Sequence, residues 1–170
     1  MNTQRRALLA IVPALAGAAA LAGCGFQLRG SDGSAAIPFK TIYLTLPDTS
    51  PLGVELRRNL RGRGVNIVAD RQGAEAVIEA LAETRDRVVQ SLNTQGRIRE
   101  LALLYRLRFR ILDRTGKELL VPTDITLKRI VTYNESQAVA KEKEEELLYR
   151  DMQSDLVQQV LRRLSALNPA

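Results

Sequence analysis

The most regular pattern of hydrophobic and polar residues in this chain spans residues 101–111, where hydrophobic residues occupy every second position. Arg106, Arg108 and Arg110 fill the polar positions in the second half of this stretch. Alternation over this length predicts a β-strand with one buried and one solvated face, as in an antiparallel sheet. The side chains predicted to face the core are Leu101, Leu103, Tyr105, Leu107, Phe109 and Ile111.

A second long strand is predicted directly afterwards, over Lys117–Tyr133. The intervening Asp113–Gly116 has the composition of a tight turn, so the two strands are expected to pair as a hairpin. Pro122 has no amide hydrogen to donate, which predicts a bulge or an edge position for this strand. The residues of one parity, expected to face the core, are Leu119, Val121, Ile125, Leu127 and Val131.

Three further stretches have strand character. Phe39–Leu46 alternates and is predicted to be a strand buried on at least one face. Val65–Val68 is a brief apolar piece that fits a strand end. Ala76–Arg87 is predicted as a strand, although its alanines and glutamates also favour a helix. As a strand it would place Ile78, Ala80 and Ala82 opposite Glu79, Leu81 and Glu83.

Apolar residues that recur every fourth position predict a short early helix. Ser50 suits the N-cap and Pro51 the first helical position, while Gly62 or Gly64 ends the helix. Its apolar face is formed by Leu52, Leu56 and Leu60.

The same spacing predicts a long helix at the C-terminal end, capped by Asn134 or Ser136 and running to about Leu167. Its apolar stripe consists of Leu148, Met152, Leu156, Val160 and Leu164. The order of elements predicts an α+β fold: a two-layer sandwich, with helices packed on one face of a mostly antiparallel sheet.

The first residues carry a different signal. Arg5 and Arg6 precede the apolar stretch Ala7–Leu21, and Leu-Ala-Gly leads into Cys24. This is the layout of a bacterial lipoprotein signal peptide, and the apolar stretch of 15 residues is shorter than the roughly 20 that span a bilayer. Cys24 is the only cysteine, so it has no internal disulfide partner. It is expected to be the lipidated first residue of the mature chain rather than a buried structural thiol.

Three segments follow from this pattern: a signal peptide over 1–23, a lipidated N-terminus and flexible tether over 24–38, and a single domain over 39–168. The formal charge of +6 becomes +4 without the two leader arginines. So small an excess, scattered among acidic residues, does not indicate a nucleic-acid partner. It suits a protein that works beside anionic lipid or phosphate.

Residue types that are missing argue against catalysis. The chain has no histidine, which removes histidine-based acid-base catalysis, serine triads and histidine metal ligands. Nucleotide-binding glycine motifs and the Gly-x-Ser-x-Gly motif are also absent from the sequence. The expectation is a non-enzymatic protein with no catalytic residue, metal or cofactor other than covalent lipid on Cys24.

Two motifs carry a resemblance to a known family. Cys24–Gly30 (Cys-Gly-Phe-Gln-Leu-Arg-Gly) resembles the start of mature LPS-assembly lipoproteins of the LptE family, where Cys-Gly-aromatic-x-Leu-Arg is typical. Tyr133–Glu135, then Ala140–Glu142 and an acidic run leading to Leu147 and Leu148, resembles the start of the last helix in that family. The order of elements and the mature length match as well.

The resemblance implies two helices packed on a small mixed sheet. It also implies a lipid-anchored protein on the periplasmic side of the outer membrane, within the β-barrel LPS translocon. There it would plug the barrel lumen, help the barrel fold, and assist delivery of LPS to the outer leaflet. The expected partners are the barrel subunit, LPS and outer-membrane lipid.

The resemblance also implies a basic LPS contact at the start of the last helix and in the loop between the middle strands. Lys141 matches the helix position, although helix propensity alone favours an ordinary solvated lysine paired with Glu145. The loop Asn93–Gly96 has no cation, so Arg97 and Arg99 are the candidates there, unless both are merely exposed.

The arginines of the best strand, Arg106, Arg108 and Arg110, face either solvent or a polar barrel lumen. They are therefore candidates for the barrel-partner interface. A rival function is a tethered periplasmic binding or pilot lipoprotein for another outer-membrane complex. A structural linker to the cell wall is a third reading, disfavoured because such linkers usually lack a packed core.

Overall fold

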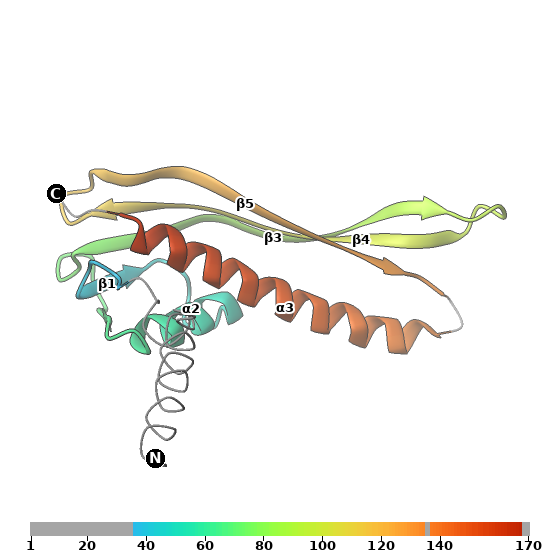
Figure 1. Cartoon of the computed structure of the whole chain (residues 1–170), viewed down its shortest axis with the longest axis horizontal. Helices are drawn as coiled ribbons and strands as arrows, with labels where there is room; N and C mark the ends of the chain where they lie inside the picture. The colour runs from blue at the N-terminus through green and yellow to red at the C-terminus, as the bar shows by residue number, and fades with distance from the viewer. Residues whose placement is uncertain (1–35, 135–136, 168–170) are drawn as a thin grey trace, which may run out of the picture. The chain divides into compact units, whose positions relative to one another are not determined.

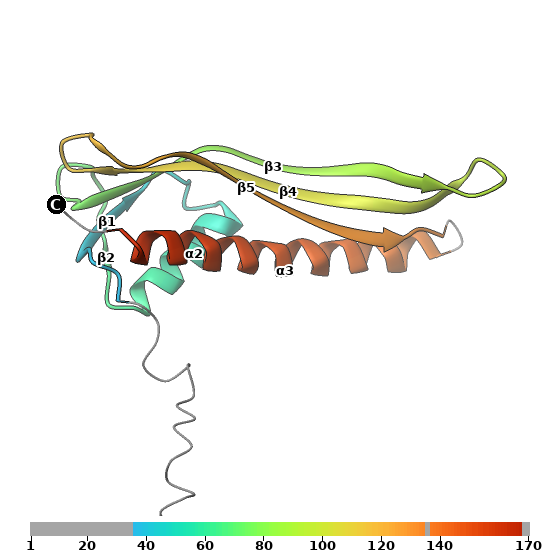
Figure 2. The same cartoon turned by 45° about the horizontal axis from the view of Figure 1, so that its top comes forward.

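A five-stranded sheet with both helices on one face forms the core of the computed structural model (Figures 1 and 2). The structure describes residues 36–134 and 137–167, which belong to one compact unit, Ala35–Ala170. The predicted signal peptide, Cys24, most of the tether and Ser136 lie outside the described residues. The elements in chain order are β1 (Thr41–Leu44), α2 (Pro51–Arg61), β2 (Asn66–Ile67), β3 (Ala76–Leu92), β4 (Ile98–Asp113), β5 (Glu118–Thr132) and α3 (Ala138–Ser165).

The sheet is mixed, with the strand order β2-β1-β3-β4-β5. β1 runs parallel to both β2 and β3. α2 carries the chain back between β1 and β2, and a loop carries it back between β2 and β3. β3, β4 and β5 form an antiparallel meander that extends well past the short parallel strands (Figure 1). The predicted fold class is therefore confirmed, and Ala76–Arg87 is a strand rather than a helix.

The main core lies between the sheet and the two helices. Every inward residue predicted for β4 is buried, and so are the apolar stripes of both helices, except for the half-buried Leu148. Ser50 caps α2 as expected, since its hydroxyl oxygen accepts a hydrogen bond from the Gly53 amide at 3.2 Å. Gly62 is the residue at which α2 ends.

A bulge in β3 corrects the predicted facing of its side chains. The register with β4 shifts between Ala80 and Ala82, so Leu81 is an extra residue in the strand. Beyond it, Ala82 lies opposite Arg108 on the open face, while Glu83 lies opposite Leu107 on the face covered by α3. Simple alternation placed these two residues on the wrong sides.

A second shift in β5 corrects the prediction for Val121. Phe109 pairs with Thr123 and Ile111 with Leu120, so β5 carries one extra residue around Pro122. β5 is also the edge strand, so Pro122 lies at both a bulge and an edge. As a result Val121 is 61% exposed instead of buried.

The start of the last helix also differs from the prediction. α3 begins at Ala138, and its N-cap residue is Gln137, which makes no capping hydrogen bond through its side chain. Asn134 is therefore not the cap; instead its carbonyl accepts a hydrogen bond from the Gln137 amide at 3.0 Å.

Candidate functional site

The three candidate LPS-contacting residues lie at the same end of the antiparallel sheet. Arg97 and Arg99 are exposed where the β3–β4 hairpin turns. The Asn93 side-chain oxygen accepts the amide of Arg97 at 2.9 Å, and Gly96 adopts the positive φ that this tight turn requires. The Arg99 carbonyl accepts the Tyr133 amide at 2.9 Å, so the end of β5 lies beside these arginines.

Lys141 joins this end from the first turns of α3. Its side chain is only 15% exposed, and its Nζ donates to Glu144 at 2.7 Å and to Thr132 at 3.3 Å. The expected pairing with Glu145 is wrong: Glu145 is buried and pairs with Arg87 of β3 at 3.3 Å. Lys141 is therefore a partly buried lysine that links α3 to β5, and a ligand would have to compete with Glu144 for its charge.

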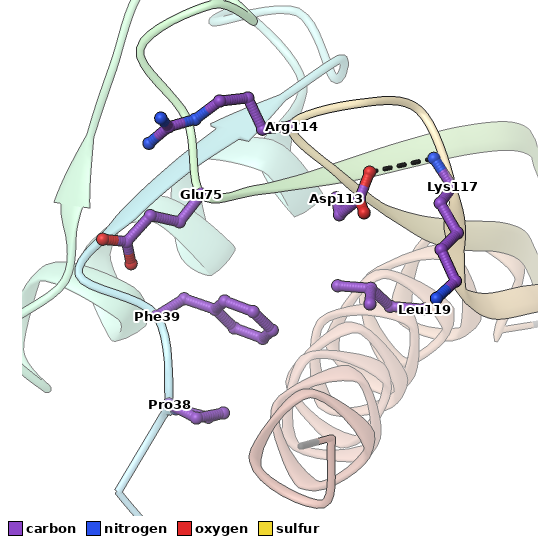
Figure 3. A pocket seen from close by; sticks show the side chains of 7 residues that line it. All are labelled: Pro38, Phe39, Glu75, Asp113, Arg114, Lys117 and Leu119. Atoms are coloured by element: carbon purple, nitrogen blue, oxygen red, sulfur yellow. Dashed lines mark hydrogen bonds between the residues drawn. The ribbon is translucent and has the colours of Figure 1, made fainter. Parts of the chain in front are cut away.

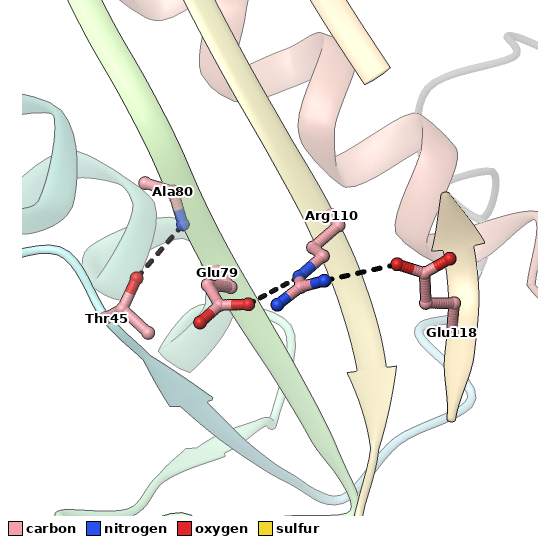
Figure 4. Close-up of polar contacts among 5 residues, drawn as sticks. All are labelled: Thr45, Glu79, Ala80, Arg110 and Glu118. Carbon is pink, nitrogen blue, oxygen red and sulfur yellow. Dashed lines mark hydrogen bonds and ion pairs between the residues drawn. The ribbon is translucent and has the colours of Figure 1, made fainter. Parts of the chain in front are cut away.

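The three candidate interface arginines lie on the face of the sheet away from the helices. Arg110 donates to Glu79 at 2.5 Å and to Glu118 at 3.2 Å, which links three strands across the face (Figure 4). These hydrogen bonds, above all the one to Glu79, raise the pKa of Arg110 above its usual range. Arg106 pairs with Asp86 at 3.5 Å.

Arg108 completes this row, exposed and in register with Asp124 of β5. The open face therefore matches cations with carboxylates strand by strand. Around these arginines it is a polar, nearly charge-balanced surface rather than a basic patch, and it can exchange hydrogen bonds with another polar wall, whereas nearer the β3–β4 turn the same face carries exposed Val88 and Ile130.

A polar cluster between the sheet and the helices was not predicted. Beyond the β3 bulge, Glu83, Arg85 and Arg87 lie on the face of the sheet that α3 covers. The Tyr105 hydroxyl donates to Glu83 at 2.6 Å and accepts from Arg85 at 2.9 Å. Burial, followed by the hydrogen bond to Glu83, raises the pKa of Tyr105 above its ordinary value, so the phenol stays neutral.

The same cluster reaches both helices. Arg85 also donates to the side-chain oxygen of Gln153 at 3.0 Å, and the Gln153 amide donates to Glu55 of α2 at 2.7 Å. The Arg85 guanidinium lies 4.5 Å from the centre of the Tyr105 ring, a cation–π contact. This cluster fixes α2 and α3 against β3 and β4. The only sign of this cluster in the sequence is the run of charged residues after Leu81. These residues face the helices only because the bulge shifts the strand by one residue.

Among the described residues, no group of three or more acidic, cysteine or histidine side chains is arranged to hold a metal ion. Within the same ranges, no helix is long and apolar enough to span a bilayer.

Solved structures share this fold. The chain superposes on the solution NMR structure of an uncharacterized lipoprotein B from Nitrosomonas europaea with a TM-score of 0.71 and 38% identity, covering 84% of this chain and 91% of that one. A minor lipoprotein from Acinetobacter baumannii gives a TM-score of 0.61 at 30% identity, over 77% and 96% of the two chains. The fold is thus a two-layer α+β domain that is also found in bacterial lipoproteins.

Sequence comparisons narrow this class. The family described as Lipopolysaccharide-assembly, LptE, matches residues 39–164. The LPS-assembly lipoprotein LptE of Pectobacterium atrosepticum is 31% identical over 153 residues, covering 86% of this chain and 79% of the relative. That of Photorhabdus laumondii is 26% identical, over 88% and 81%. The chain belongs to the LptE family of LPS-assembly lipoproteins, which confirms the resemblance seen in its motifs.

Proposed function

We propose that this protein is a non-enzymatic outer-membrane lipoprotein that plugs a β-barrel LPS translocon, helps it assemble and assists delivery of LPS. The observation that carries the proposal is the family match over residues 39–164. The predicted acylation of Cys24 supplies the anchor, since two or more acyl chains hold a protein stably to a bilayer.

The open face of the sheet is the proposed contact with the barrel wall. A barrel lumen is polar and hydrated, so a surface that enters it must exchange hydrogen bonds rather than bury apolar groups. Arg108 and Arg110 lie opposite Asp124 and Glu79, and Arg106 pairs with Asp86, so the three arginines supply such a surface.

At the far end of the sheet, Arg97, Arg99 and Lys141 are proposed to contact LPS. Guanidinium and ammonium groups pair well with lipid A phosphates and sugar carboxylates. In this role they would weaken the packing between LPS molecules as these pass the plug.

Recovery of the acylated protein from outer-membrane extract tests the barrel partnership. The expected result is stoichiometric co-purification of a large β-barrel protein. A secretin, or no partner at all, would favour the rival pilot or binding lipoprotein instead. Mass spectrometry of the same material should find Cys24 acylated as the first residue.

Charge reversal tests the LPS contact separately. Arg97→Glu, Arg99→Glu and Lys141→Glu together should lower the affinity for LPS at least tenfold, while the barrel complex survives. As a control for total charge, the same number of reversals at exposed Arg58, Arg71 and Arg162 should leave LPS affinity unchanged. Equal effects of the two sets would remove the three residues from the mechanism.

A further inference from the structure

A small cavity opens where the chain enters the domain, beside the β4–β5 turn (Figure 3). Its volume is about 250 Å³. Its lining residues are Pro38, Phe39, Glu75, Asp113, Arg114, Lys117 and Leu119. These come from the entering chain, from the residue before β3, and from the turn and the start of β5, so the fold itself assembles the cavity.

The two carboxylates of the cavity are already engaged by local donors. Glu75 accepts the Lys40 amide at 2.6 Å. One oxygen of Asp113 accepts the Thr115 amide, the Thr115 hydroxyl and the Lys117 amide, at 2.7–2.9 Å. These hydrogen bonds, led by that from the Thr115 side chain, lower the pKa of Asp113, so it remains a carboxylate that holds the turn.

The two cations of the cavity are not engaged. The side chains of Arg114 and Lys117 are exposed and make no hydrogen bond or ion pair to the described part of the chain. Phe39 and Leu119 are the largest apolar residues of the lining; the Lys117 amine lies beside Leu119, and the Arg114 side chain extends on the other side of the view (Figure 3). A cavity lined by two exposed cations together with apolar Phe39 and Leu119 matches a ligand with an anionic head directly joined to an apolar body.

The position of the cavity identifies the source of such a ligand. Pro38 follows Cys24 by 14 positions, and 14 residues span at most about 50 Å when fully extended. The cavity therefore stays within that distance of the acylated cysteine. It also lies at the opposite end of β4 from Arg97 and Arg99, since β4 runs from Ile98 to Asp113.

We propose that this cavity binds the phosphate-bearing headgroup of an anionic phospholipid in the bilayer that holds the anchor. Arg114 and Lys117 pair with the phosphate, and the glycerol and first methylenes lie against Phe39 and Leu119. The bound lipid would orient the domain, with the cavity (the anchor end) on the bilayer and the end that carries Arg97, Arg99 and Lys141 (the cationic end) away from it. The inference rests on the proposed acylation of Cys24.

The test uses the acylated full-length protein, its anchor verified by mass spectrometry, in phosphatidylcholine nanodiscs. Because Cys24 is the sole native cysteine and is acylated, Val121→Cys supplies a unique exposed site for an environment-sensitive fluorophore near Leu119. Replacing about one third of the lipid by phosphatidylglycerol should shift the emission to the blue.

Arg114→Glu with Lys117→Glu should reduce this shift to about one tenth or less, because each cation near an anionic surface contributes a factor of about five. Arg58→Glu with Lys143→Glu makes the same change in net charge elsewhere and should leave the shift intact. Leu119→Ser should also reduce the shift, which a purely electrostatic contact would not require. Circular dichroism checks that each variant is folded.

Three results would overturn the proposal: no shift with phosphatidylglycerol, an equal loss in the control pair, or no effect of Leu119→Ser. Inorganic phosphate added to phosphatidylcholine discs should produce no shift; a full response would make the cavity a site for free phosphate. Barrel co-purification is scored on the same variants, so failure here is distinguishable from failure of the proposed function.

Discussion

The hydroxyl of Tyr105 is the centre of the polar cluster, so Tyr105→Phe is a sharp test of what that cluster contributes. The ring is fully buried, and phenylalanine keeps its packing against the core. Only one oxygen is removed. With it go the hydrogen bond donated to Glu83 at 2.6 Å and the one accepted from Arg85 at 2.9 Å.

The expected cost follows from the partners. Hydrogen bonds to charged groups contribute about 1.5–3 kcal/mol each where they are buried. Arg85 is exposed and Glu83 is half-buried, so water replaces part of what each loses. The expected loss is about 1.5 kcal/mol in the free energy of unfolding, or about 5 °C in Tm for a domain of this size.

Urea unfolding followed by circular dichroism measures this loss. Tyr43→Phe is the matched control, because the half-buried Tyr43 hydroxyl has no hydrogen-bond partner in the described residues. It should change stability by less than about 0.5 kcal/mol. Combining Tyr105→Phe with Glu83→Gln should give less than the sum of the single effects, since both remove the same bond.

Two outcomes would refute the reasoning. Equal effects of Tyr105→Phe and Tyr43→Phe would mean that the hydroxyl of Tyr105 contributes no more than one exposed to water. Strict additivity with Glu83→Gln would mean that the 2.6 Å contact carries no coupling energy.

Three further predictions concern stability. The pKa of Tyr105 is raised by folding, so near pH 10 the unfolded chain loses the phenol proton while the folded chain keeps it. The free energy of unfolding should therefore be constant below pH 10 and fall as the pH rises above 10. Urea unfolding at alkaline pH should show a smaller fall in Tyr105→Phe than in the parent protein. Leu164→Ala removes a fully buried side chain and should cost about 2–5 kcal/mol in urea unfolding, whereas Leu147→Ala, at a site 58% exposed, should cost under about 0.5. Gly116→Ala forces a side chain into a φ of +90° in the β4–β5 turn and should cost about 1–2 kcal/mol by the same assay; no change would contradict the strain argument.

The sequence predicted those elements in which one periodicity persists. In β4 the alternation is unbroken from Leu101 to Ile111, and every inward residue is buried. In α3 the four-residue spacing from Leu148 to Leu164 identifies the stripe that packs on the sheet. Periodicity works here because one burial environment extends along the whole element.

The predicted facing of side chains was wrong where an extra residue interrupts the alternation along a strand. A single extra residue at Leu81 turns Glu83 and Arg85 toward α3, and another near Pro122 turns Val121 to solvent. Pro122 indicated the bulge in β5, but no residue type marks the one at Leu81, because it satisfies the geometry of the partner strand rather than a local preference. The sequence contains every residue of the polar cluster, but it does not show that the bulge turns Glu83 and Arg85 toward the helices, so the cluster was not predicted.

At the candidate LPS contact, the ion pairing of Lys141 differs from the pairing that its helix suggested. Lys141 was expected to pair along its own helix with Glu145, but that carboxylate is drawn to Arg87 on the neighbouring strand. Glu144 takes its place at 2.7 Å. The choice between two glutamates one residue apart depends on which of them faces the sheet, and that is set by tertiary packing.

The length of β4 connects the two proposed lipid sites. Its 16 residues, at about 3.3 Å per residue, span about 50 Å between the β4–β5 turn and the cationic end near Arg99. The hydrocarbon core of a bilayer is about 30 Å thick. With Arg114 and Lys117 on the periplasmic surface and the strand aligned along a barrel axis, Arg97, Arg99 and Lys141 would reach the level of the outer leaflet. Shortening the β3–β4 hairpin by an even number of paired residues should therefore impair LPS delivery while leaving the anchor-end cavity intact.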